Sequence, residues 1–142
     1  MDLQLKGKTA LVTGASMGIG RAIAQGLAAE GVKLCIAARR RHLLEELSKD
    51  IVAARGPAPI LAVVDVMEEG APQRLAATAL EALGQTDILV NCAGGSRPPI
   101  AVDAPEEDWD RAMTLNFIRV REVTHAVLPG MIERRWGRII NI

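Results

Sequence analysis

The octapeptide Thr13-Gly14-Ala15-Ser16-Met17-Gly18-Ile19-Gly20 follows a short apolar run and opens a segment with the apolar periodicity of a helix. Several backbone N–H groups and the positive end of that helix therefore face one small volume, into which a pyrophosphate fits. We expect Gly14 to take the tight turn, Gly18 to let the phosphate approach the backbone, and Gly20 to let helix and strand pack closely. The alternative is a tight strand-to-helix turn that binds nothing. A P-loop is excluded because no Gly-Lys-Ser or Gly-Lys-Thr follows.

Short apolar runs alternate with helical segments along the chain, and no linker, repeat or low-complexity tract interrupts them. The expected strands are Thr9–Val12, Leu34–Ala37, Ile60–Asp65, Ile88–Asn91 and Arg138–Ile142. They are almost continuously apolar, as strands covered on both faces are. The pattern predicts one α/β domain over residues 1–142, with a doubly wound parallel sheet truncated after the fifth strand. Ligands bind such sheets at the carboxyl ends of the strands, beside the point where the strand order reverses.

Helical segments are expected between these strands. The first three end at or before a glycine: Gly31, Gly56 and Gly84. A longer fourth helix begins at Glu106 after a proline and has an acidic first turn. We expect it to be kinked at Asn116 and disturbed at Pro129.

The composition excludes several classes of partner. The 142 residues are 49% hydrophobic, and 17 Lys plus Arg balance 17 Asp plus Glu. Without a net charge, no field gathers nucleic acid or an anionic membrane surface, so neither partner is expected. The apolar runs are far shorter than the roughly 18 residues that a bilayer span needs, and no signal pattern opens the chain, so we expect a cytoplasmic protein. Cys35 and Cys92 show no ligand spacing with His42 or His125, and no metal is expected.

The glycine spacing Gly-x-x-x-Gly-x-Gly, together with Asn91-Cys92-Ala93-Gly94 after the fourth strand, resembles the short-chain dehydrogenase/reductase family, which is of the Rossmann type. The resemblance runs from Lys6 to the last residue. It includes the following further segments: Asp65-Val66, Asp87–Asn91, Leu115-Asn116-Phe117, Pro129 and Gly137–Ile142. It implies an NAD(P)-dependent oxidoreductase that reduces a carbonyl or oxidises an alcohol by hydride transfer.

The resemblance also implies roles for particular residues. Asp65 and Val66 would hold the adenine ring, a carboxylate accepting from the exocyclic amine beside an apolar wall. Asn116 would be the catalytic Asn that holds a water in a proton relay. The floor under the cofactor ribose would be formed by Asn91, Ala93 and Gly94. Asp65 could instead be an ordinary strand-end Asp, and Asn116 a kink residue that bonds its own backbone. Cys92 stands where the family often has a second Asn.

The end of the second strand bears on the choice of cofactor. Ala38 stands where NAD-preferring members of the family carry an Asp for the ribose 2′-OH, and Arg39 and Arg40 follow. A missing carboxylate and a guanidinium favour a 2′-phosphate, so we expect NADP, with NAD as the alternative cofactor. Many members of the family also have a basic residue in the glycine loop, and this sequence has Met17 at that position. The loop residues expected to contact the cofactor are Gly14, Ser16, Met17, Gly18, Ile19 and Gly20. A solvated Arg39–Arg41 run is the alternative interpretation.

The family's chemistry uses a Ser, a Tyr phenol and a Lys, and this sequence contains no Tyr. We therefore expect an amino-terminal part of such an enzyme, with a complete dinucleotide site and an incomplete active site. The alternative is a non-catalytic dinucleotide-binding module; a methyltransferase with a related loop is disfavoured by Asn91–Gly94 and Arg39. The segment Gly95–Ile100, with two prolines, is expected to form a stiff wall of the substrate region. The resemblance implies a small carbonyl or alcohol substrate, and a dimer or tetramer in which the long helix pairs with its equivalent.

Overall fold

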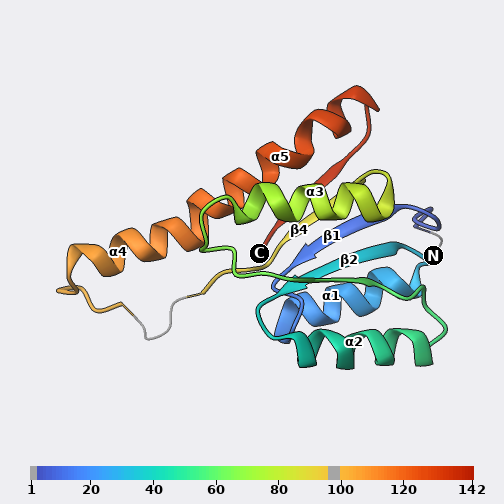
Figure 1. The fold of residues 1–142 in the computed structure, drawn as a ribbon, viewed down its shortest axis with the longest axis horizontal. Coiled ribbons are helices and arrows are strands. Elements are labelled where there is room, and N and C mark those ends of the chain that lie inside the picture. The colour runs from blue at the N-terminus through green and yellow to red at the C-terminus, as the bar shows by residue number, and fades with distance from the viewer. Residues whose placement is uncertain (1–2, 96–99) are drawn as a thin grey trace.

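A computed structural model describes residues 3–95 and 100–142. The strands are β1 (Thr9–Thr13), β2 (Lys33–Ala38), β3 (Ile60–Val63), β4 (Ile88–Asn91) and β5 (Arg138–Asn141). The helices are α1 (Gly18–Ala29), α2 (Arg41–Ala53), α3 (Ala71–Leu83), α4 (Glu106–Met113), the π-turn η1 (Thr114–Ile118) and α5 (Arg119–Glu133). The strands pair in parallel in the order β3-β2-β1-β4-β5 (Figure 1).

The strand order reverses between β1 and β4. From β1 the chain runs outward to β2 and β3, returns to pair β4 with β1, and continues outward to β5. Helices α1 and α2 cover one face of the sheet, and α3 and α5 cover the other (Figure 1). This arrangement confirms the predicted doubly wound parallel sheet, and it places the carboxyl ends of β1 and β4 side by side at the reversal point.

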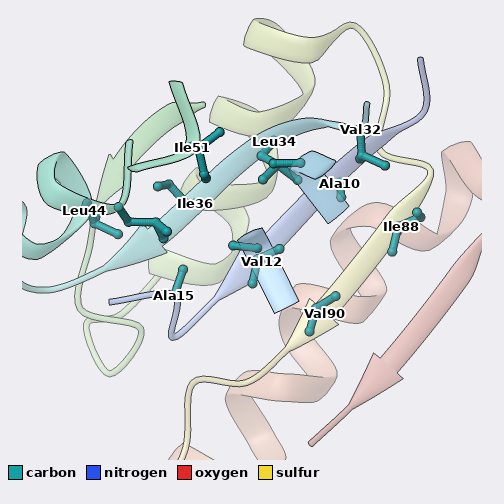
Figure 2. Packing of buried hydrophobic residues seen from close by; sticks show 13 residues of the cluster. Ala10, Val12, Ala15, Val32, Leu34, Ile36, Leu44, Ile51, Ile88 and Val90 are labelled. Carbon is teal, nitrogen blue, oxygen red and sulfur yellow. The ribbon is translucent and has the colours of Figure 1, made fainter. Parts of the chain in front are cut away.

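The strand alternation divides the core into two layers. Leu11 pairs with Cys35 and with Leu89 in register, and all three side chains face α3 and α5. The residues one position earlier along each strand face α1 and α2: Ala10, Leu34 and Ile88 (Figure 2). Each of these residues is at most 3% exposed. Because both faces of these strands are covered, side chains on either face point into the core. This explains why the segments are continuous apolar runs in the sequence.

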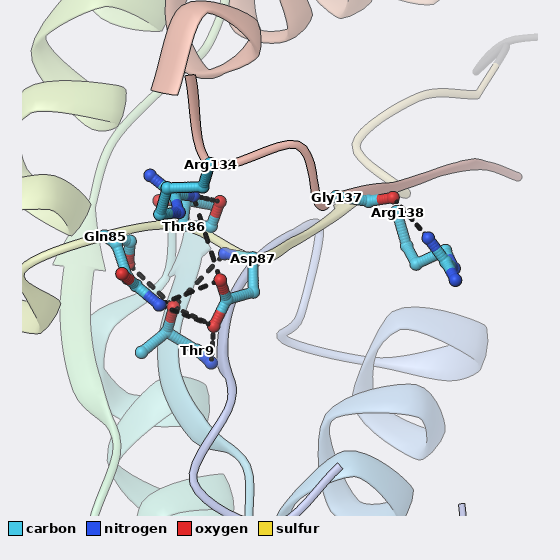
Figure 3. Close-up of polar contacts among 7 residues, drawn as sticks. All are labelled: Thr9, Gln85, Thr86, Asp87, Arg134, Gly137 and Arg138. Atoms are coloured by element: carbon cyan, nitrogen blue, oxygen red, sulfur yellow. Dashed lines mark hydrogen bonds and ion pairs between the residues drawn. The ribbon is translucent and has the colours of Figure 1, made fainter. Parts of the chain in front are cut away.

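A polar cluster closes the amino-terminal end of the sheet (Figure 3). The Asp87 carboxylate accepts hydrogen bonds from the Thr9 backbone N–H at 3.0 Å and from Gln85 Nε2 at 2.9 Å. Arg134, at the end of α5, donates to the carbonyl of Thr86 at 2.9 Å and lies 3.8 Å from Asp87. Asp87 is 2% exposed, so its charge is stabilised by these donors instead of by water. The cluster ties β1, β4 and α5 together at the end of the sheet opposite the glycine loop.

Strand boundaries shift by at most two residues from the expected ranges, and the helices differ from the expectation at Asn116 and at Pro129. β3 ends at Val63, and Asp65 already belongs to a turn. The disturbance expected at Asn116 is a π-turn, in which the Arg119 N–H reaches back to the carbonyl of Thr114. The disturbance expected at Pro129 does not end the helix, because α5 continues through this residue. Pro129 lies on an exposed side of the helix, where water can bind the carbonyl that its missing N–H leaves free.

Candidate cofactor site

The glycines of the loop after β1 fall into two kinds. Gly14 has φ +65°, and a Cβ built on it would lie 2.5 Å from the carbonyl oxygen of Cys92. A Cβ on Gly20 would collide with the carbonyl oxygen of Gly14. Gly18 has φ +57°, but its built Cβ meets nothing within 4 Å. Gly14 and Gly20 are therefore needed for packing, whereas Gly18 leaves open space in front of the first turn of α1.

The amino terminus of α1 is free to face an anion. Met17 at the N-cap position is extended and gives no side-chain cap, and the first turn carries no acidic residue. The first N–H groups of a helix have no partner within the helix, and they carry its partial positive charge. Met17 and Ile19 are exposed, and Ser16 is half-buried beside them. The loop thus has the donors and the open space that a pyrophosphate requires.

Thr13 organises this edge of the sheet, a role that the sequence did not reveal. Its hydroxyl donates to the carbonyl of Val90 at 3.3 Å and accepts from the backbone N–H groups of Cys92 and Ala93, each at 3.1 Å. Thr13 is 2% exposed. One hydroxyl at the end of β1 therefore fixes the loop after β4 against the glycine loop. A polar residue ending an otherwise apolar strand is a signal for such a bond, but its partners cannot be read from the sequence.

Cys92 lies directly behind the glycine loop. Its thiol is hydrogen-bonded to the backbone of Gly20. Burial raises the pKa of the Cys92 thiol, and the bond to Gly20 lowers it in part. The sulfur therefore supplies a loop contact at the position where the family often has a second Asn.

Asn91, Ala93 and Gly94 occupy the carboxyl end of β4. The Asn91 side chain is buried and donates to Thr124 Oγ1 at 3.1 Å and to Asn141 Oδ1 at 2.9 Å. These bonds tie β4 to α5 and β5, so the side chain of Asn91 serves the sheet. Ala93 and Gly94 present backbone and little else, as the expected ribose floor requires.

Asn116 holds the loop that follows β4. Its Oδ1 accepts from the Gly95 N–H at 2.8 Å, and its Nδ2 donates to the Gly95 carbonyl at 3.0 Å. The same Nδ2 donates to the carbonyl of Ala112 at 2.9 Å, which combines the predicted kink with a bond to the site. A Cβ on Gly94 would lie 2.7 Å from Asn116 Oδ1, so the close approach requires glycine there. Residues 96–99, in the expected proline-stiffened wall, lie outside the described residues.

Asp65 and Val66 form the turn after β3. The Met67 N–H donates to Asp65 Oδ1 at 3.0 Å, and Val66 packs against the apolar layer under α3 and α5. The predicted carboxylate and apolar wall thus stand next to each other, at the carboxyl end of an outer strand.

Arg39 and Arg40 are exposed at the carboxyl end of β2. Arg40 Nη2 lies 3.2 Å from the Met17 sulfur, a weak acceptor, so this guanidinium reaches the glycine loop. The structure therefore brings a cation to the loop position where the sequence itself has none.

No role in the site is expected for the two histidines. His42 and His125 are exposed. Within residues 3–95 and 100–142, no group of three or more His, Cys, Asp or Glu could hold a metal ion. In the same ranges no helix is long and apolar enough to cross a membrane.

Comparison with known proteins agrees with this geometry. The family model described as short chain dehydrogenase matches residues 8–142. The chain is 42% identical over 141 residues to a short chain dehydrogenase of Pseudocercospora fijiensis, covering 98% of this chain and 45% of that protein. It is 38% identical over 141 residues to the 3-oxoacyl-[acyl-carrier-protein] reductase of Escherichia coli K12, covering 99% and 56%. The chain belongs to the short chain dehydrogenase family, and it spans about half the length of these relatives.

Solved structures give the same result. A 7α-hydroxysteroid dehydrogenase complexed with NADH and 7-oxo glycochenodeoxycholic acid matches with a TM-score of 0.93 and 33% identity, over 99% of this chain and 55% of the other. A metagenomic short-chain oxidoreductase in complex with NADP matches with a TM-score of 0.88 and 35% identity, over 96% and 62%. The chain therefore shares its fold with enzymes whose structures were solved in complex with NADH and with NADP.

Proposed function

We propose that this chain is the cofactor-binding part of an NAD(P)-dependent oxidoreductase that interconverts a carbonyl and an alcohol. The observation that carries the proposal is the glycine loop, where Gly14 and Gly20 are packed tightly and Gly18 opens onto an uncapped helix end. The bound nicotinamide supplies or accepts the hydride. The protein groups bind the pyrophosphate, the adenine and the ribose. Titration of the chain with NADP and NAD by calorimetry tests this: saturable binding of at least one is expected, and binding of neither contradicts the proposal.

NADP is proposed as the preferred cofactor. The support is local: Ala38 offers no carboxylate to a ribose 2′-OH, and Arg39 and Arg40 are exposed next to the loop. A guanidinium binds a phosphate through charge-assisted bonds, which a neutral ribose hydroxyl does not provide. The same calorimetric titration measures the preference as the ratio of the two dissociation constants.

Asn116 is proposed to hold a water in the proton relay of the complete active site. This chain has no Tyr to act as the acid, and so we propose that it binds cofactor without turnover. The absence of Tyr equally favours the second candidate function, a dinucleotide-binding module that works by binding alone. An assay of a longer chain that supplies the family's Ser, Tyr and Lys separates the two, because only the enzyme part gains turnover.

Association with a second copy is also proposed. Trp109, Met113 and Phe117 recur at intervals of four residues along α4 and η1 and are each 45% to 55% exposed. Such a contiguous apolar stripe is typical of a protein interface.

A cytoplasmic location is proposed as well. The two free cysteines, Cys35 and Cys92, fit a reducing compartment.

A further inference from the structure

The turn that follows β3 receives limited support from the sheet. The Val64 N–H donates to the carbonyl of Ala38 at 3.0 Å. Beyond this bond, the Asp65 side chain accepts from the Met67 N–H at 3.0 Å, and its carbonyl accepts from the Glu68 N–H at 3.1 Å. These bonds define the shape of the turn, but they are local to it. Val64 and Val66 also pack against the apolar layer under α3 and α5, and the backbone of Met67, which follows them, is bonded from elsewhere in the chain.

Arg119, the first residue of α5, provides such a contact from 52 positions further along. Its Nη2 donates to the carbonyl of Met67 at 3.0 Å, and its Nη1 donates to Glu122 Oε2 at 2.7 Å. Glu122 lies three residues on in the same helix and so fixes the guanidinium in one orientation. The guanidinium of Arg119 therefore links the Met67 carbonyl to α5, with one nitrogen bonded to Met67 and the other to Glu122.

The setting of Arg119 is unfavourable for a residue that serves stability alone. Its side chain is 16% exposed, and that of Glu122 is 24% exposed. Arg119 Nε is buried and has no hydrogen-bond partner among the described residues. Withdrawing a guanidinium from water and leaving one donor unmet is unfavourable compared with an apolar side chain of similar size. A positioning task explains the residue better than a contribution to stability does.

Arg119 also connects two parts of the proposed site. It follows directly on the π-turn that carries Asn116, whose side chain binds both polar backbone atoms of Gly95. The stretch of residues 116–119 therefore contacts the loop after β4 and the turn after β3. Both lie at the carboxyl edge of the sheet, where the cofactor is proposed to bind.

We propose that Arg119 is a positioning residue that sets the place of the Asp65–Met67 turn, and with it the affinity for the adenine half of the cofactor. The inference rests on the proposed function, because it takes Asp65 and Val66 as the adenine contacts. Since Asp65 Oδ1 is bonded to the Met67 N–H, a shift of Met67 moves the carboxylate with it. Arg119 itself touches no cofactor atom in this account.

Calorimetric titration with adenosine 2′,5′-bisphosphate, which carries the adenine half alone, tests the proposal on the 142-residue chain. Arg119→Ala removes the bond to Met67 and is expected to weaken binding about 10-fold. Arg119→Lys keeps the charge, but a single ammonium group cannot reproduce the two guanidinium bonds to Met67 and Glu122. We therefore expect the affinity for the bisphosphate to fall about threefold. Arg121→Ala removes an exposed arginine two residues along the same helix and should leave the affinity unchanged.

Binding of nicotinamide mononucleotide, followed by NMR, separates positioning from a general structural role. The Arg119 variants are expected to bind it like the wild-type chain, and an equal loss of both fragments contradicts the inference. A folded Arg119→Ala variant that binds the bisphosphate within about a factor of two of wild type also overturns it. If Arg119→Ala does not fold, wild-type affinity in Arg119→Lys overturns it in the same way. A wild-type chain that binds neither NADP nor NAD instead contradicts the proposed function.

Discussion

Arg39 is the residue whose removal should separate the two cofactors. A charged hydrogen bond contributes about 1.5 to 3 kcal/mol, so Arg39→Ala is expected to weaken NADP binding roughly 10- to 150-fold. NAD lacks the 2′-phosphate, and its affinity should change little. Calorimetric titration of both cofactors measures the two effects, with Lys49→Ala as a control at an exposed position of α2. Equal losses for NADP and NAD would assign Arg39 to folding.

Cys35 is expected to give the fold a pH dependence in the alkaline range. It is fully buried in β2, and burial raises the pKa of its thiol from 9.0 to about 11. Above pH 9 the thiol ionises in the unfolded chain and stays protonated in the folded one. Its stabilising contribution is therefore complete below pH 9, and about 2 to 3 kcal/mol is lost as the pH rises to 11.

Urea unfolding of the wild type and of Cys35→Ala at several pH values from 8 to 11 checks this expectation. The variant is less stable overall because of its cavity, so the comparison concerns the slope with pH. The slope between pH 9 and pH 11 should be shallower in Cys35→Ala. No Tyr titrates in this range to obscure it. The same slope in both proteins would show that another group is responsible.

Several single residues of the site could not be found from the sequence. The glycine loop could be recognised because its positive φ angles and the close approach of neighbouring backbone atoms permit only glycine at those positions. Thr13 and Arg119 act through bonds to residues 77 and 52 positions away, and no local pattern marks such partners. Asn91 stays a predicted residue of the ribose floor, but the bonds of its side chain to α5 and β5 could not be read from the sequence. Long-range hydrogen bonds are therefore the part of the site that only the structure supplied.

At the scale of elements, the contact between η1 and the loop after β4 predicts an unequal effect of two similar substitutions. In Gly94→Ala the new Cβ would lie 2.7 Å from Asn116 Oδ1, and a loss of about 1 to 3 kcal/mol in unfolding free energy is expected. In Gly26→Ala the new Cβ meets nothing within 4 Å inside α1, and a gain of about 0.5 to 1 kcal/mol is expected. Urea titration of both variants is the measurement, and equal effects would remove the requirement for close packing at Gly94.

The sequence predicted the elements well where periodicity and glycines act together. α1 and α3 end where Gly31 and Gly84 adopt positive φ, as expected. β3 was predicted too long because Asp65 follows an apolar run without interruption, and the turn that removes it from the strand depends on its own side chain. The π-turn at Asn116 was expected only as a kink, because its hydrogen-bond pattern depends on the loop after β4, which Asn116 binds.

At the scale of the whole molecule, alternation of strand and helix was sufficient to predict the doubly wound sheet. The handedness of crossovers leaves few topologies for such a chain. The clustered polar end around Asp87 was not expected, because it depends on side chains from β1, β4 and α5 meeting after folding.

The isolated 142-residue chain should bind cofactor, show no turnover and self-associate. Without a phenol to transfer the proton, a factor of roughly 10² to 10⁴ in rate is missing from general acid catalysis. β5 is exposed along its whole length and leaves an open sheet edge, which favours association. Steady-state assays with NADP and carbonyl compounds, together with analytical ultracentrifugation, check both statements. A soluble monomer that turns over NADP at enzymatic rates would require another acid, and His125 on α5 would be the group to examine.

The glycine loop is the most direct place to test the central claim that this edge binds a dinucleotide. Gly18→Val places a side chain in the open space before α1 and forces an unfavourable positive φ, so at least about a 10-fold loss of NADP affinity is expected. Gly26→Val, in the same helix and with free space around it, should keep the wild-type affinity. Both are measured by calorimetry beside circular dichroism to establish folding. A folded Gly18→Val variant that binds NADP within about a factor of two of wild type would place the pyrophosphate elsewhere and contradict the account.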